Sequence, residues 1–237
     1  MTSVQEFYDR QWKSSREDLF SLAFREAIAK SYSFLGNVHG KKVLEIGCGS
    51  GEQASYLAAQ GAIVTVIDIS AESLKTAQEL AKKKEVELTA VRMNAEELTF
   101  PAESFDLVYI NSTLMHVQQQ KVLQECSRVL KKGGRLVVIE PLRYAPLVQI
   151  YRLFSSYRKM NPQYATFKMF RAGKEYFADY NHQEFYLFSS ALLPVFSLKY
   201  RWLHQSYDTI SKVDNFLLKI IPPLRYGCWV SVVEYTK

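Results

Sequence analysis

Three glycines at alternate positions, Gly47, Gly49 and Gly51, lie between a short apolar run and a segment with helical spacing. Glycine lets the backbone take positive φ and approach a ligand closely, because it has no Cβ. A carboxylate precedes this turn at Glu45, and another follows at Asp68, at the end of the next apolar run. The Asp68 carboxylate could accept hydrogen bonds from both hydroxyls of a ribose. The combination indicates a site for a ribose-containing ligand more strongly than a turn that serves packing alone.

A dinucleotide is the first alternative for such a turn. The dinucleotide fingerprint G-x-G-x-x-G needs its third glycine at position 52, where this chain has Glu52. A carboxylate at the start of the helix would repel a pyrophosphate at the point where the helix N-terminus should attract it. The pattern G-x-G-x-G, preceded by Glu45, therefore favours a ligand without phosphates.

Two histidines are candidates for acid–base chemistry. His116, in NSTLMHV, follows a predicted strand, so it could act as a general base beside the end of that strand. The alternative is a histidine that only packs at a helix start. His182, in DYNHQEF, is the second candidate, with simple exposure as its alternative. The cysteines are scattered and odd in number, which gives no metal-site spacing and suits a reducing compartment: Cys48, Cys126 and Cys228.

These residues need a framework that gathers them at one edge. Buried strands separated by helical patterns are predicted at five apolar runs: 42–46, 62–68, 86–93, 104–111 and 134–141. Ser70 is expected to cap the helix after the second strand, and residues 226–237 fit a final strand. Such alternation implies right-handed crossovers and an open, doubly wound sheet of the α/β class. Ligands bind outside the carboxyl ends of its strands, where the glycine turn is expected.

Charge divides the chain into two halves. Residues 1–140 hold 17 Lys and Arg against 18 Asp and Glu, whereas residues 141–237 hold 13 against 6 and also 21 of the 32 aromatic residues. The basic residues of the second half alternate with aliphatic ones and form no runs, which does not favour nucleic acid as a partner. No apolar run approaches the length of a membrane span, and the polar N-terminus lacks a signal-peptide pattern, so we expect a cytoplasmic protein.

Five segments within residues 40–141 carry a resemblance in order and spacing: VLEIGCGSG, VIDIS, MNAEELTFPAESFDLVYI, LMHV and RVLKKGGRLVVIEP. Together they resemble the class I S-adenosylmethionine-dependent methyltransferases of the small-molecule type. The resemblance implies a mostly parallel seven-stranded Rossmann-like sheet with an antiparallel last strand. It also implies S-adenosyl-L-methionine as cofactor, with contacts carried over to Tyr8, Glu45, Gly47, Cys48, Gly49, Gly51, Asp68, Ile69, Asn94, Ala95, Glu96, Asn111 and Ser112.

Within that set the glycine turn would approach the methionine part, and Asn111 and Ser112 would lie beside it. Asp68 would hold the ribose, and residues 94–96 would contact adenine. The family usually has Asp-Ala where this chain has Asn94 and Ala95. An amide oxygen can still accept a hydrogen bond from the adenine amino group, so we expect binding to persist.

The resemblance also implies how the acceptor is covered. Residues 1–35 would form an N-terminal cover, with Tyr8 near the sulfonium and Trp12 near the substrate. Residues 142–194 would form a mostly helical lid inserted after the fifth strand, leaving 36–141 and 195–237 as the core. Predicted substrate contacts are Trp12, Arg143, Tyr144 and Tyr151.

The expected activity is methyl transfer to a medium-sized hydrophobic small molecule, with an anionic acceptor as one option. Oxygen, as a carboxylate or hydroxyl, is the favoured atom, as in the tailoring of secondary metabolites. N- or C-methylation of a lipid, quinone or other membrane-associated metabolite is the alternative, and a membrane-surface enzyme stays open because basic and aromatic helices suit an interface. Nucleobase methyltransferases carry an Asn/Asp-Pro-Pro-aromatic motif where this chain has NSTL. A binding scaffold without activity is disfavoured by the intact glycines and Asp68.

Overall fold

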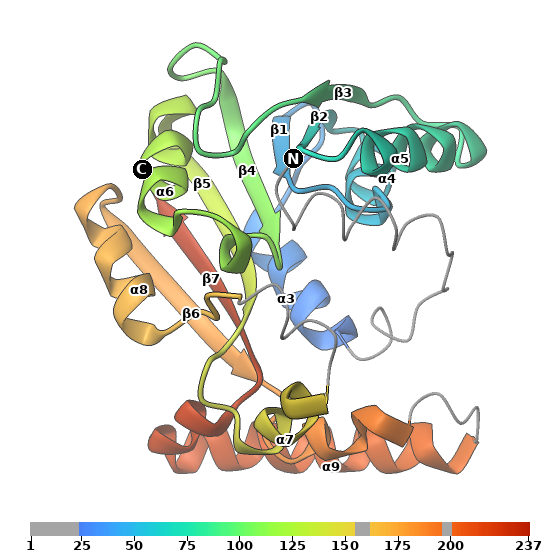
Figure 1. Ribbon diagram of the computed structural model, residues 1–237, viewed down its shortest axis with the longest axis vertical. Coiled ribbons are helices and arrows are strands. Elements are labelled where there is room, and N and C mark those ends of the chain that lie inside the picture. Colours follow the sequence, from blue (N-terminus) through green and yellow to red (C-terminus); the bar gives the residue numbers. More distant parts are fainter. Residues whose placement is uncertain (1–23, 155–161, 196–200) are drawn as a thin grey trace.

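The computed structural model describes residues 24–154, 162–195 and 201–237 (Figure 1). Its seven strands form one open sheet in the order β3-β2-β1-β4-β5-β7-β6. β7 runs antiparallel to both β5 and β6, whereas the pairs among β1 to β5 are parallel. The predicted fold class is therefore confirmed. The strands are β1 (Lys42–Ile46), β2 (Ile63–Asp68), β3 (Thr89–Arg92), β4 (Phe105–Asn111), β5 (Leu130–Pro141), β6 (Asp179–Phe185) and β7 (Val230–Thr236).

Helices cover both faces of the sheet. The described α-helices are α3 (Arg25–Leu35), α4 (Glu52–Ala59), α5 (Ala71–Lys83), α6 (Gln119–Val129), α7 (Pro146–Phe154), α8 (Phe167–Ala172) and α9 (Arg201–Ile220). One buried apolar cluster joins one face of the sheet to α3, α4 and α5, and a second joins the other face to α6 and α8. Short 3-10 turns are η1 (Leu114–His116), η3 (Gly173–Glu175), η4 (Ser189–Val195) and η5 (Pro222–Gly227). α7 and α9 lie at one end of the sheet (Figure 1).

Local sequence accounts for the helix starts beside the site. Gly51 is the N-cap of α4 in the left-handed conformation, with φ of 77°. Ser70 is the N-cap of α5, and its hydroxyl accepts a hydrogen bond from the Ser73 amide at 3.1 Å, as predicted. Both helices therefore begin directly after the strand ends that carry the glycine turn and Asp68.

The final strand, predicted over residues 226–237, begins only at Val230, because residues up to Gly227 form η5. The starts of β5 and β3 differ from the prediction as well. β5 begins at Leu130, directly after α6, because Leu130 pairs with Phe105 before the register shifts and Arg135 pairs with Leu107. We predicted its start at residue 134. β3 begins only at Thr89, where its pairing with Thr65 of β2 starts, although the apolar pattern begins at residue 86. In both cases the boundary is set by the partner strand, which the local pattern does not contain.

The predicted lid, residues 142–194, is partly corrected. It does contain α7 and α8, but residues 179–185 form β6, an edge strand of the sheet. The exposure of these residues changes with a period of two, as in a strand with one covered face: Asn181 and Gln183 are exposed, and Tyr180 and His182 are half-buried. His182 therefore belongs to the sheet.

Candidate functional site

The glycine turn is closely packed as well as left-handed. Gly47 has φ of 74°, and a Cβ built on it would lie 2.1 Å from the Thr113 hydroxyl oxygen. A Cβ on Gly51 would lie 2.6 Å from the Cβ of Ala77 on α5. The turn thus brings β1 against the end of β4 and against α5 with no room for side chains. Cys48, between the glycines, is buried.

Asp68 is held beside this turn by two backbone amides. Its Oδ2 accepts a hydrogen bond from the Gly49 amide at 3.3 Å, and its Oδ1 accepts one from the Ser70 amide at 2.9 Å. A carboxylate has about four acceptor sites, more than these two amides occupy. The neighbouring Ile69 is 38% exposed, which leaves an apolar surface next to the carboxylate. The two turns therefore fix the orientation of Asp68 in advance of any ligand.

The end of β4 completes this side of the site. The Thr113 hydroxyl donates to the Ile46 carbonyl at 3.2 Å and so joins the ends of β4 and β1. Ser112 has φ of 57°, and its hydroxyl donates to the Asn111 side-chain oxygen at 3.0 Å. Asn111 and Ser112 are thereby held next to the glycine turn.

The predicted adenine segment lies one strand further along. The Met93 amide donates to the Asp68 carbonyl at 3.2 Å, which joins residues 94–96 to the end of β2. The Asn94 side-chain oxygen accepts from the Glu96 amide at 3.0 Å, and Ala95 is buried. Glu96 in turn accepts from the Gln118 amide at 2.9 Å. The segment is thus fixed between the end of β2 and the start of α6.

Two buried carboxyl groups lie on the central strands. Burial, with a smaller contribution from the nearby Asp68 carboxylate, raises the pKa of Glu45 to about 8. Burial also raises the pKa of Glu140 to about 8, against backbone amides that lower it. One oxygen of each group, Oε2, has no hydrogen-bond partner among the described residues. Both groups are therefore mostly neutral at pH 7 in the folded, ligand-free chain.

Glu140 is a site residue that the sequence prediction missed. Its Oε1 accepts a hydrogen bond of 2.6 Å from the Leu114 amide, at the start of the 3-10 turn that carries His116. Glu140 thus ties the end of β5 to η1. The glutamate of VVIEP at a strand end was the available clue, but the partner is 26 residues away.

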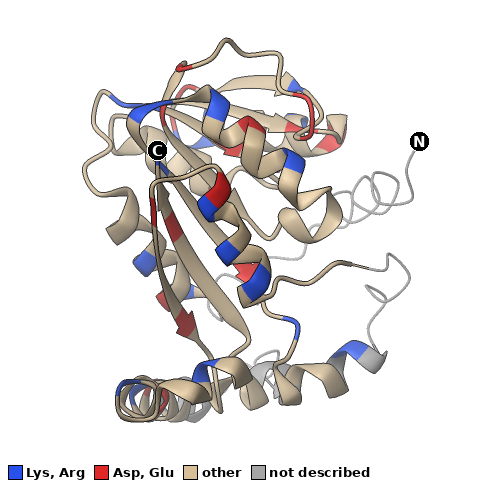
Figure 2. Cartoon of the chain, turned by 90° about the vertical axis from the view of Figure 1, so that its left-hand side faces the viewer, with Lys and Arg blue, Asp and Glu red and all other residues tan. Residues whose placement is uncertain are grey.

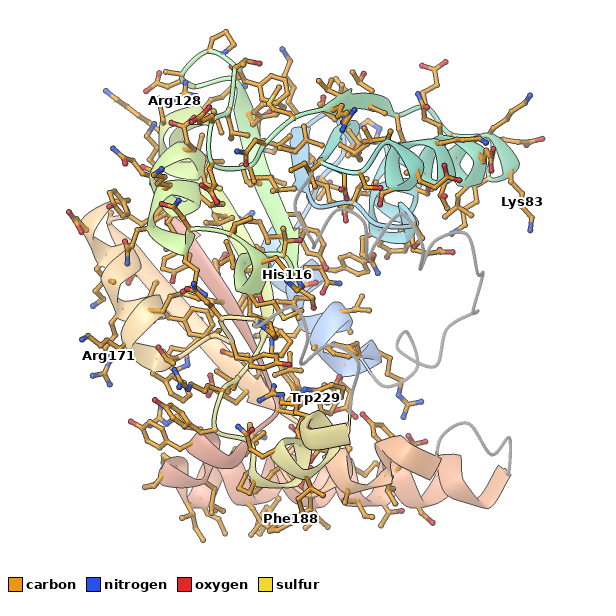
Figure 3. All side chains as sticks on the ribbon, in the orientation of Figure 1. Lys83, His116, Arg128, Arg171, Phe188 and Trp229 are labelled. Atoms are coloured by element: carbon orange, nitrogen blue, oxygen red, sulfur yellow. The ribbon has the colours of Figure 1, made fainter. Side chains whose placement is uncertain are left out.

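His116 lies in η1, directly after the end of β4 (Figure 3). Burial lowers the pKa of its imidazole to about 4, because the surroundings disfavour the charged form. The ring is therefore neutral at pH 7, as a base must be before it accepts a proton. A pKa this low also makes it a weak base.

His182 is not brought to this group. β5 and β7 separate its strand, β6, from β4, and β1 lies one strand further. At about 4.8 Å between strands, β6 is roughly 19 Å from β1. The His182 Nδ1 is instead 2.7 Å from Glu184, which also accepts from Ser231 at 2.9 Å. The second acid–base candidate is therefore wrong for this site.

Residues after β5 lie across η1. The Gln163 amide donates to the Met115 carbonyl at 2.8 Å, and the Arg143 amide donates to the Ala165 carbonyl at 2.9 Å. Arg152, which the prediction missed, donates to the Arg143 carbonyl at 3.1 Å and stacks on Tyr164, its guanidinium carbon 3.5 Å from the ring centroid. This segment thus covers the end of β5 next to His116.

The other predicted substrate contacts are placed only in part. Arg143 and Tyr144 are exposed just beyond β5. Tyr151 lies on α7, but its side chain is not described, and Tyr8 and Trp12 lie outside the described residues. The described part of the chain contains no group of three or more His, Cys, Asp or Glu arranged to hold a metal ion.

Comparisons with known proteins agree with this geometry. Residues 44–138 match a family model described as "Methyltransferase domain". The chain is 38% identical to the demethylmenaquinone methyltransferase of Tropheryma whipplei over 127 residues, 52% of each protein. It is 35% identical to the ubiquinone biosynthesis O-methyltransferase of Coxiella burnetii over 98 residues, 41% of this chain and 42% of that one. The chain thus spans about half or less of the length of these curated relatives.

A solved structure extends the likeness of fold to the whole chain. The geranyl diphosphate C-methyltransferase of Streptomyces coelicolor, in complex with Mg²⁺, geranyl diphosphate and S-adenosyl-L-homocysteine, superposes with a TM-score of 0.68. The identity is 15%, and the match covers 99% of this chain and 98% of that one. The family-model match over residues 44–138 and the shared fold together support the expected resemblance to the class I S-adenosylmethionine-dependent methyltransferases.

Proposed function

We propose that the chain binds S-adenosylmethionine at the glycine turn and transfers its methyl group to an apolar small molecule. The observation that carries the proposal is the meeting of the turn, Asp68 and the end of β4 at one edge, inside the segment that matches a methyltransferase domain.

The residues present fit this cofactor. S-adenosylmethionine carries an ammonium and a sulfonium, so it suits a site with carboxyl groups. Glu45 is buried below the turn with Oε2 unpartnered within the described residues, and Asp68 is oriented by two amides. When bound, the cofactor supplies an electrophilic methyl group that an in-line nucleophile can displace without a covalent enzyme intermediate. The protein then has to position both reactants and exclude water.

The chain's own residues divide this work. Gly47, Cys48 and Gly49 would lie along the methionine part, with Asn111 and Ser112 beside it. Asp68 would accept hydrogen bonds from the ribose hydroxyls, with Ile69 and residues 94–96 against adenine. Tyr8 and Trp12 stay predictions for the cover.

For the acceptor, we propose a hydroxylated quinone-type ring. Support comes from the quinone-pathway names of the two curated relatives and from the aromatic-rich second half of the chain. The phenolic oxygen is the favoured atom, and neutral His116 would accept its hydrogen bond and then its proton. A ring carbon is the second candidate, favoured by the neighbour of the same fold, which is a C-methyltransferase by name.

The test has two stages. Calorimetry should first show binding of S-adenosylmethionine and of S-adenosylhomocysteine to the purified chain. Incubation with a deuterium-labelled methyl donor and a short-chain hydroxyquinone in its reduced form should then give one labelled product by mass spectrometry, with fragmentation separating methoxy from ring methyl. Binding of NAD in place of S-adenosylmethionine would overturn the assignment of the site. Binding of the cofactor without labelled product would overturn the acceptor class.

A further inference from the structure

α9 exposes an apolar stripe to solvent. Val213, Phe216 and Ile220 are 48%, 62% and 56% exposed. Their spacing of three and four residues places them on one side of the helix. Lys212 and Lys219 are also exposed and lie along one flank of this stripe. We call these five residues the outer face of α9.

The opposite side of α9 is the one that holds the helix to the protein. Tyr207, Ser211 and Asp214 are buried there. The Ser211 hydroxyl donates to the Glu26 carboxylate, and Asp214 accepts from the Phe188 and Ser189 amides. These bonds fix which side of the helix faces outward. The apolar stripe is therefore a surface feature and not part of the core.

Further large apolar residues are exposed near α9. Ile221, which follows the helix directly, is 45% exposed, and Phe188 is 50% exposed. Figure 3 places Phe188 at the edge formed by α9. Ile150 of α7 is 61% exposed, and α7 and α9 both contact η4. A soluble monomer rarely gathers so many large exposed apolar residues in one region.

The charges around this apolar region indicate the kind of surface that it could bind. Of the two acids on the described part of α9, Asp214 is buried, and Asp208, which is 47% exposed on the lysine flank, is paired with Arg25. Lys212 and Lys219 remain exposed there, and Figure 2 shows basic residues on the helices at this end. Residues 141–237 as a whole carry a net charge of +7. Apolar side chains flanked by lysines fit the headgroup region of an anionic bilayer.

We propose that the outer face of α9 docks the protein on the surface of an anionic lipid bilayer. None of the helices in the described ranges is long and apolar enough to cross a membrane, so the contact would be a shallow one parallel to the surface. The proposal concerns a binding surface and does not depend on methyl transfer. Under the proposed function, docking would bring the chain to acceptors that partition into lipid.

The experiment is flotation of the full chain with vesicles of phosphatidylcholine alone or mixed with phosphatidylglycerol. Wild type should float with the mixed vesicles, bind less to phosphatidylcholine alone and dissociate as salt rises. The pair Phe216→Ser and Ile220→Ser should lower binding at least about tenfold by removing inserted apolar area. Lys212→Gln and Lys219→Gln should each cost about fivefold on anionic vesicles only.

The matched control removes an equally exposed apolar residue and lysine elsewhere. Ile63 is 59% exposed on β2, and the Lys75 side chain is 66% exposed on α5. Ile63→Ser with Lys75→Gln should leave flotation unchanged. Thermal melts of all variants show whether each is folded.

Three outcomes would overturn the proposal. Wild type that fails to float with anionic vesicles excludes bilayer docking, whether or not the chain binds S-adenosylmethionine. A dimer in light scattering that Phe216→Ser converts to a monomer would show that the outer face of α9 meets a second copy of the chain. Equal loss of flotation in the control variant would show that the binding is not specific to α9.

Discussion

Two neighbouring regions at the carboxyl edge of the sheet are built differently. At the ends of β1, β2 and β4, backbone does most of the work: amides orient the Asp68 carboxylate, and two glycines allow strands and helices to meet without side chains. At the end of β5, side chains take over: Glu140 holds η1, and Arg152 holds the segment after the strand. Backbone groups are the same in every sequence, so the first region can bind the same ligand in many proteins. The side chains of the second region can differ from one protein to the next and so suit different acceptors.

The largest effect on stability is expected for Glu140, at the end of β5. The folded-state pKa of Glu140, about 8, lies above the value of about 4.5 in the unfolded chain. Its favourable contribution is therefore complete below pH 4.5 and is lost as pH rises to about 8. Gln cannot ionise. Between pH 5 and 8 the free energy of unfolding should therefore fall by roughly 3–5 kcal/mol less in Glu140→Gln than in the wild type. Chemical denaturation across this pH range measures it.

Glu125 gives the matched contrast for that experiment. Its pKa is lowered by the hydrogen bond from Arg128, so its contribution is present at neutral pH and is lost as pH falls. Glu125→Gln should therefore reduce stability at neutral pH and not raise it. The same direction of change in both variants would contradict the neutral state of Glu140.

The next largest effect concerns the packing of the glycine turn against the end of β4. Gly47→Ala should destabilise the ligand-free chain by about 2–4 kcal/mol, from left-handed strain together with contact with Thr113. Gly40 has φ of 70° with nothing within 4 Å of a built Cβ, so Gly40→Ala should cost only about 1–2 kcal/mol. Thr113→Ala should partly rescue Gly47→Ala in a double-mutant cycle. If the two glycine variants lost the same free energy of unfolding, contact with Thr113 would not explain the effect at Gly47.

Substitution of His116 tests whether the region at the end of β5 acts on the same reaction as the glycine turn and Asp68. With a hydroxyl acceptor, His116→Ala should lower kcat about a hundredfold, at the low end for a general base because its pKa is near 4. Because His116 stays neutral above about pH 5, its titration should not change kcat/KM between pH 8 and about 5. The control, His182→Ala, should leave kcat unchanged. A small effect of His116→Ala with a raised KM in Arg143→Ala would indicate a carboxylate acceptor.

The smallest effect concerns cofactor affinity. Asp68→Ala should weaken S-adenosylmethionine binding by about 1–3 kcal/mol, because the ribose hydroxyls lose a charged acceptor. Asp106 at the start of β4, on the opposite edge, pairs with Lys131 at 2.8 Å. Asp106→Asn should leave affinity unchanged in calorimetry. Undiminished affinity in Asp68→Ala would exclude the ribose assignment.

The comparison also explains what could be predicted from the sequence. The glycine turn, Asp68 and the Ser70 cap are specified within a few residues, so spacing alone located them. Glu140 and Arg152 act on partners brought near by folding, and no local pattern names those partners. β6 was hidden for a similar reason, because a short polar alternating stretch becomes a strand only when β7 pairs with it.

The steric fit of Gly47 and Gly51 has an evolutionary consequence. Selection for folding alone would retain both glycines, since a methyl group at either position meets Thr113 or Ala77. A lineage that had abandoned methyl transfer would therefore keep most of its fingerprint. Decay would show first at exposed positions such as Ile69 and Asn94, where substitution disturbs little packing.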